Sequence, residues 1–199
     1  GKYKIDGIHY DYIRFHNSNY GFNKDGLSEF YRLNGYELND SKNDYDLIFS
    51  EFKRNSITEF VKEAKEKIRL NSPKLIISAA VKPNIYDAKL LFFQEWDLWL
   101  SAGYIDWAVP MNYMVKNDDF IQNMYLIRDN IPSRYHDKIV VGISTYNQNP
   151  RLAVLRTFFQ RSCIEVGGSN HHKRGNINSK KPKQVNDYLH VFACIYTVY

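Results

Sequence analysis

The length and composition of the chain are those of one globular domain with a hydrophobic core. It has 199 residues, of which 44% are hydrophobic and 25% charged, and no run approaches the roughly 20 apolar residues that a membrane-spanning helix needs. The net charge of +5 is concentrated in residues 151–199, which carry +6, whereas residues 1–150 sum to −1. The main body therefore lacks the basic surface of a nucleic-acid-binding protein, and we expect neither a nucleic-acid partner nor a membrane span.

Aromatic residues and cysteines narrow the possibilities further. Aromatic residues make up 16% of the chain and include 16 Tyr, and their flat apolar faces suit sugar rings as well as core packing. The two cysteines, Cys163 and Cys194, do not make a disulfide framework and lack the spacing of metal ligands. We expect no metal and no organic cofactor.

The first predicted strand comes almost at the start of the chain. Residues from Ile5 to Phe15 are rich in Ile and Tyr and mix apolar with polar positions as strands do. Neither an initiator Met nor a signal peptide precedes them, so we expect that the natural protein begins before Gly1. Residues 16–44, rich in Asn, Asp, Gly and Ser, are predicted to form a long loop.

A helix and a buried strand are predicted after this loop. Ser56 and Glu59 fit the capping-box pattern, and apolar residues then recur at helical spacing as far as Ile68. The sequence Asn-Ser-Pro at residues 71–73 is expected to end the helix. Residues 75–81 are almost entirely apolar, which is typical of a parallel strand covered on both faces.

The main body goes on alternating between helices and strands. The predicted elements are a helix over Asp87–Ala102 capped by Gly103, a strand over Ile105–Tyr113, a helix from Asp118 to near Pro132, a strand over Ile139–Tyr146 and a helix from Pro150. Strict alternation predicts an α/β fold with a parallel sheet. Periodicity is lost after residue 162, so we expect a domain over residues 1–162. Residues 163–199 would be a basic tail, either disordered or read from a shifted frame.

Polar residues at predicted strand ends are the candidates for chemistry, because parallel barrels build their sites there. The first strand ends in His9-Tyr10-Asp11-Tyr12-Ile13-Arg14, and His9 and Asp11 share one strand face. Together they could act in catalysis, whereas a structural ion pair between Asp11 and Arg14 is the alternative. Asp106 lies at the start of its strand and is excluded.

A second carboxylate and several sugar-binding groups come from later segments. Glu95, in the run FFQEWDLW, is the next candidate acid, although it could also be a surface residue. Amide and phenol groups at the ends of the third and fourth strands suit sugar hydroxyls, and these belong to Asn112, Tyr113, Tyr146 and Asn147.

Four stretches of the chain together resemble one family. They are IDGIHYDYIRF, FKRNSITEFV, FFQEWDLWLSAGYIDWAVPMNY and VVGISTYNQNP, and in this order they are similar to successive blocks of the bacterial glycosyl hydrolase-like family ten over residues 1 to about 150. The resemblance implies an incomplete (β/α)8 TIM barrel that holds about strands four to seven with their helices. It also implies an extracellular or cell-envelope glycoside hydrolase that acts on polysaccharides.

The first block also resembles the strand-four motif of alpha-amylase-type enzymes, D-G-h-R-h-D. Asp11 falls on the nucleophile of that motif, while His9 replaces its Arg. Ala79 and Ala80 end the next strand, so the amylase-type acid has no counterpart there. The acid/base role therefore goes to Glu95, which falls where the family's motif resembles Q-D-W.

The resulting interpretation is a glycoside hydrolase with a two-carboxylate mechanism. Asp11 would be nucleophile or transition-state stabiliser and Glu95 the acid/base. The sugar hydroxyls of an oligo- or polysaccharide would be bound by His9, Arg14, Asn112, Tyr113, Tyr146 and Asn147. A glycan-binding barrel without turnover and a metal-dependent polysaccharide deacetylase remain alternatives, and the oligomeric state is unknown. We also expect the 199-residue piece alone to be inactive and unstable, because four or five parallel strands cannot close a barrel.

Overall fold

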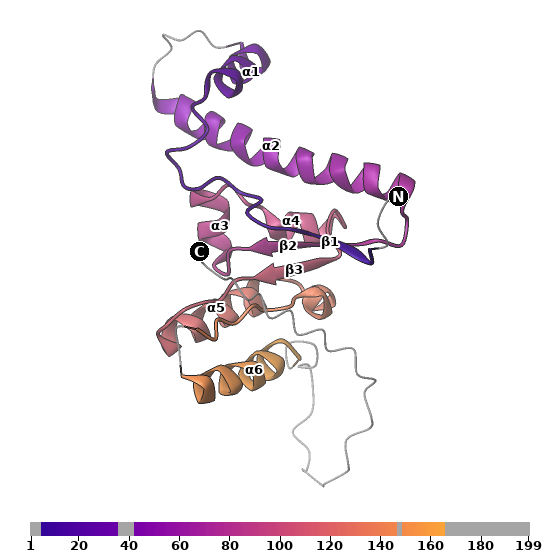
Figure 1. Cartoon of the computed structure of the whole chain (residues 1–199). Coiled ribbons are helices and arrows are strands. Elements are labelled where there is room, and N and C mark those ends of the chain that lie inside the picture. The colour runs from indigo at the N-terminus through magenta and orange to yellow at the C-terminus, as the bar shows by residue number, and fades with distance from the viewer. Residues whose placement is uncertain (1–4, 36–41, 147–148, 166–199) are drawn as a thin grey trace.

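A computed structural model describes residues 5–35, 42–146 and 149–165 (Figure 1). Its elements in chain order are β1 (Gly7–Tyr10), α1 (Lys24–Asn34), α2 (Lys42–Asn71), β2 (Ile76–Val81), α3 (Ile85–Leu91), α4 (Trp96–Ser101), β3 (Trp107–Pro110), α5 (Asn117–Asn130), the 3-10 helix η1 (Ser133–Lys138) and α6 (Pro150–Glu165). The predicted mixed α/β class is confirmed. None of the described helices is long and apolar enough to cross a membrane.

Within the described residues, the sheet has three parallel strands in the order β1-β2-β3. A fourth strand over Ile139–Tyr146 was predicted, but this segment forms only two isolated parallel bridges to the chain of β3. Val140 donates to the Ala108 carbonyl and Gly142 to the Pro110 carbonyl, at 2.9 and 2.8 Å. In a regular parallel ladder the residue at position 110 would donate its N–H to the Val140 carbonyl. Pro110 has no N–H, so the ladder is interrupted at this point.

The segment predicted as a long loop contains a helix. Residues 24–34 form α1, and α2 begins at residue 42, well before the predicted capping box. Ser56 is not an N-cap, because it lies inside α2 and its hydroxyl donates to the Phe52 carbonyl at 2.7 Å. The cause is tertiary packing, since the Phe30 ring of α1 lies 5.0 Å from Phe49 and 5.4 Å from Phe52 of α2.

The single helix predicted over Asp87–Ala102 is broken into α3 and α4. Phe93 lies at the break with a left-handed backbone (φ 54°), and Gln94 beside it is buried. Gly103 has φ 69° after the end of α4, as expected of a C-terminal cap. The apolar periodicity continues through the break, because Phe93 and Trp96 are both buried in the interior.

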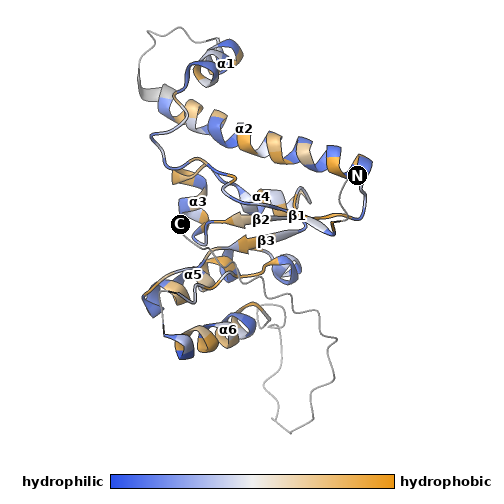
Figure 2. Ribbon diagram, in the orientation of Figure 1, coloured by the Kyte–Doolittle hydropathy of each residue, from blue (hydrophilic) through white to orange (hydrophobic). Residues whose placement is uncertain are grey.

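The core lies on the sheet between two groups of helices. Figure 1 shows α2 on one side of the sheet and α5 with α6 on the other, and Figure 2 shows the apolar colour of β2 and β3 between them. Ile77, Ala79 and Val81 of β2 are fully buried, as are Trp96 and Trp99 of α4.

The predicted boundary at residue 162 falls inside α6, which continues to Glu165. Cys163 is buried in the core cluster. Residues 166–199, which include Cys194 and most of the predicted tail, lie outside the described residues.

Candidate functional site

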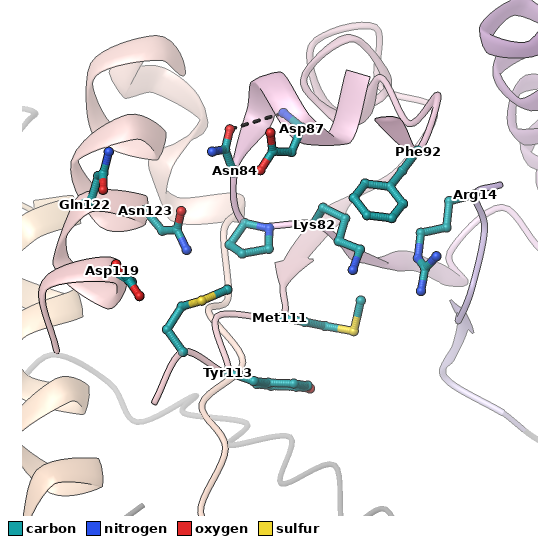
Figure 3. Close-up of a pocket in the computed structure, with 12 residues that line it drawn as sticks. Arg14, Lys82, Asn84, Asp87, Phe92, Met111, Tyr113, Asp119, Gln122 and Asn123 are labelled. Carbon is teal, nitrogen blue, oxygen red and sulfur yellow. Dashed lines mark hydrogen bonds between the residues drawn. The ribbon is translucent and has the colours of Figure 1, made fainter. Parts of the chain in front are cut away.

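A pocket of about 570 Å³ lies at the carboxyl ends of the three strands (Figure 3). It is lined by residues that follow β1, β2 and β3 and by the first half of α5: Arg14, Lys82, Pro83, Asn84, Asp87, Phe92, Met111, Tyr113, Met114, Asp119, Gln122 and Asn123. The carboxyl ends of parallel strands meet at one sheet edge, where α/β proteins place their ligands. The pocket is therefore the candidate site.

Gln94 ties together the chain segments that form one wall of this pocket. Its side-chain oxygen accepts from the Lys82 N–H at 2.8 Å, and its amide group donates to the carbonyls of Ile13 and Ala80 at 3.1 and 3.3 Å. The Trp96 indole donates to the Lys82 carbonyl at 3.0 Å. Sequence analysis missed Gln94, although a lone amide in an apolar run was a signal that a buried hydrogen bond is needed there.

Two cations on the same wall of the pocket both lie close to the Phe92 ring. The Lys82 ammonium lies 4.2 Å from the centre of the Phe92 ring and the Arg14 guanidinium 5.2 Å from it. Burial lowers the pKa of Lys82, Arg14 lowers it further and Asp87 partly opposes both. Figure 3 shows the charged ends of Lys82 and Arg14 pointing into the same space beside Met111.

His9 and Asp11 lie at the end of β1, as predicted, but neither lines this pocket. The Nδ1 atom of His9 is 2.8 Å from the Ser78 hydroxyl on β2. Partial burial lowers the pKa of His9, and the nearby Asp11 carboxylate opposes this shift. Asp11 is exposed and accepts from the Tyr12 N–H at 2.8 Å. Tyr12 has φ 57°, a left-handed conformation that is uncommon for a residue other than glycine.

Glu95 lies outside the pocket, at the N-cap position of α4. Its carboxylate is 2.8 Å from the Lys89 ammonium of α3 and 3.9 Å from the Arg54 guanidinium of α2, and its side chain is 12% exposed. Asp106 accepts from the Ile77 N–H at 2.7 Å and pairs with Arg69, which gives it a structural role at the opposite end of the sheet.

Of the remaining predicted sugar-binding residues, one lines the pocket, one is buried in the interior and one is exposed to solvent. Tyr113 lines the pocket, as Arg14 does. Asn112 is fully buried, donates to the Phe120 carbonyl at 3.0 Å and accepts from Asn123 at 3.1 Å. Tyr146 is 81% exposed, and Asn147 lies outside the described residues.

Asp87 and Asp119 are pocket carboxylates that sequence analysis did not select. Their signal in the sequence was a place in the first turn of a helix that follows a strand. In the part of the chain that the structure describes, no three His, Cys, Asp or Glu side chains gather in a way that could hold a metal ion.

The pocket lies within the part of the chain that matches a known protein family. The family described as glycosyl hydrolase-like 10 matches residues 1–151, a range that contains every residue lining the pocket. No curated protein matches the chain closely enough to count as a relative. The resemblance of the four sequence blocks is confirmed, and the chain belongs to the glycosyl hydrolase-like 10 family.

Proposed function

We propose that the chain carries the site of a glycoside hydrolase, at the carboxyl edge of β1, β2 and β3. The observation that carries this proposal is the pocket at that edge, with the Phe92 and Tyr113 rings and several carboxylates and amides in its wall. Aromatic faces with a few polar groups are what a sugar site needs. Family membership supports the same function. A parallel sheet with alternating helices is compatible with part of a (β/α)8 barrel, the fold proposed for the complete enzyme.

Asp11, which lies at the same edge of the sheet but does not line the pocket, is proposed as nucleophile or transition-state stabiliser. It follows β1 directly, its side chain is exposed, and the Tyr12 N–H orients one carboxylate oxygen. As nucleophile it would attack the anomeric carbon while the leaving oxygen takes a proton, and water would then hydrolyse the glycosyl-enzyme. Oligo- or polysaccharide would be the substrate, at an extracellular or cell-envelope location.

The second carboxylate has more than one candidate. Glu95 keeps the place that the family motif suggests, although its carboxylate pairs with Lys89 and Arg54 outside the pocket. Asp87 and Asp119 line the pocket itself, and this favours them as rival proton donors. The general acid matters most for poor leaving groups, so kinetics can separate the three.

The test is hydrolysis of polysaccharides and activated aryl glycosides by the complete wild-type protein and its variants, followed as new reducing ends or released phenol. Asp11→Asn should lower turnover at least about 100-fold and leave the melting temperature unchanged, because an asparagine oxygen can still accept from Tyr12. Asp25→Asn, on the exposed side of α1, is the matched control.

The acid is the residue among Glu95, Asp87 and Asp119 whose amide variant loses activity on natural substrates but keeps it on activated ones. Near wild-type turnover by Asp11→Asn would remove Asp11 from the mechanism. Glycan binding without products would favour the binding-protein alternative. Release of acetate without new reducing ends would favour the deacetylase.

A further inference from the structure

We infer that Arg14 and Lys82 form a subsite for a sugar carboxylate, so that the glycan taken by this pocket carries uronic acid residues. The inference rests on the proposed function, because the subsite belongs to the same pocket. It adds the chemical class of the substrate, which family membership leaves open.

The first argument is that neither cation forms an ion pair with a described residue. Within residues 5–35, 42–146 and 149–165, neither side chain forms an ion pair, and the Lys82 ammonium has no hydrogen bond. Arg14 donates from Nη1 to the Phe15 carbonyl at 3.2 Å, while its buried Nε has no hydrogen-bond partner among the described residues. The Arg14 guanidinium therefore keeps hydrogen-bonding capacity that no described residue uses, and a ligand oxygen in the pocket could use it.

The second argument is that two positive charges are held together in a partly buried place. Burial and the Arg14 charge both lower the pKa of Lys82, and Asp87 compensates only in part. An anion between the two cations would relieve this repulsion and would be attracted more strongly than in water. The Lys82 ammonium lies against the Phe92 ring, and the Arg14 guanidinium lies against Phe92 and, at 4.0 Å, against the Tyr12 ring. These contacts restrict both side chains, and Figure 3 shows their charged ends pointing into the same space.

The third argument is that the backbone holds the pair in place without any ligand. Lys82 is fixed through its N–H by Gln94 and through its carbonyl by the Trp96 indole. The segment after Arg14 is fixed because Phe15 donates to the Phe92 carbonyl at 3.1 Å. Groups already in position lose little entropy on binding, which favours a specific contact.

The chemistry of the pocket selects a carboxylate rather than a dianion. Asp87 and Asp119 line the same pocket and would repel a phosphate monoester more strongly than a group of single charge. A carboxylate also matches the planar, two-pronged donor geometry of a guanidinium. Tyr113 and Gln122 are left to bind the neutral hydroxyls of the ring.

The experiment is calorimetric titration of the complete protein with oligogalacturonate, oligoglucuronate and oligomannuronate, each paired with its carboxyl-reduced form. At least one acidic oligosaccharide should bind about tenfold or more tightly than its reduced partner, and the difference should shrink in high salt. Lys82→Met and Arg14→Gln should lose that tenfold preference, whereas Lys82→Arg should keep it. Lys74→Met, exposed at the opposite end of β2, is the matched control and should bind as wild type does.

Thermal melting of the variants separates a binding role from a structural one. Lys82→Met keeps the apolar stem and removes the repelling charge, so its melting temperature should equal or exceed that of wild type. A large fall in melting temperature would mean that the Lys82 charge serves the fold and would overturn the inference.

Three other results would also overturn it: reduced forms that bind as tightly as every acidic partner, variants that keep the preference, or inorganic sulfate and phosphate that displace probes as effectively as free uronate. The proposed function fails separately. Uronate binding without any hydrolysis would reject the glycosidase and keep the subsite, while hydrolysis of neutral glycans without charge dependence would do the reverse.

Discussion

At the scale of single residues, the end of β1 couples an imidazole to a carboxylate. The pKa of His9 is lowered by partial burial and held up by Asp11. Asp11→Asn should therefore lower the pKa of His9 further, because the carboxylate that stabilises the imidazolium is lost. The measurement is a titration of the His9 ring signals by NMR in both proteins.

A rise of the His9 pKa, or no change, would contradict a stabilising interaction between the Asp11 carboxylate and the His9 imidazolium. Asp129→Asn on α5 is the control that should leave the His9 pKa unchanged.

The sign of the effect on stability follows from the same shift of the His9 pKa. His9 releases its proton at lower pH in the folded state than in the unfolded one, so its contribution is complete above a pH of about 6.5 and is lost as the pH falls through the folded pKa.

At the scale of elements, the segment between α3 and α4 connects the strand ends. Gln94→Leu keeps the volume but removes the three hydrogen bonds to Lys82, Ile13 and Ala80. The groups left unpaired at this buried position should lower the free energy of unfolding by about 1–3 kcal/mol, as measured by urea denaturation.

The matched control is Gln160→Leu on α6. Its buried side-chain oxygen has no hydrogen-bond partner among the residues that the structure describes, so replacing it should cost little or even stabilise the protein. Equal losses in the two variants would show that Gln94 does not hold the strand ends together.

At the scale of the whole molecule, Lys53 lies where the α1 layer meets the segment between α3 and α4. The main core surrounds β2, whereas α1 packs on α2 through Phe30 and Phe49, which are not part of that core. The buried Lys53 ammonium lies 3.9 Å from the centre of the Phe93 ring and 4.9 Å from that of Phe49, and donates to the Ser18 carbonyl at 3.1 Å. It thus links the α1 layer to the rest of the fold.

We expect the amides of α1 to exchange with solvent faster than those of β2, because the smaller cluster opens at lower free energy. Lys53→Met, which keeps the stem but removes the ammonium, should speed exchange in α1 and leave β2 unchanged. Hydrogen exchange followed by mass spectrometry gives both rates. Equal protection of α1 and β2 in wild type would show that the two clusters open as one unit.

The amino-acid pattern by itself determined the class of the fold and the edge at which the pocket forms. Alternating helical and strand periods follow from burial, and burial can be read from apolar spacing. The pattern also predicted the buried strand β2 and the polar residues that follow the strands, among them Arg14 and Tyr113. Family membership could also be read from the order of four short blocks.

Only the tertiary structure decided the details that depend on one hydrogen bond or one contact. Apolar spacing runs unbroken through Phe93, so it could not show that Gln94 would leave the helix to bind the strand ends. That break also set the direction of Glu95, which turned toward Arg54 and Lys89 and away from the pocket. Side-chain direction after a break depends on partners distant in sequence. The spacing of apolar residues carries no information about such partners, because it indicates which positions are buried and not which residues bury them.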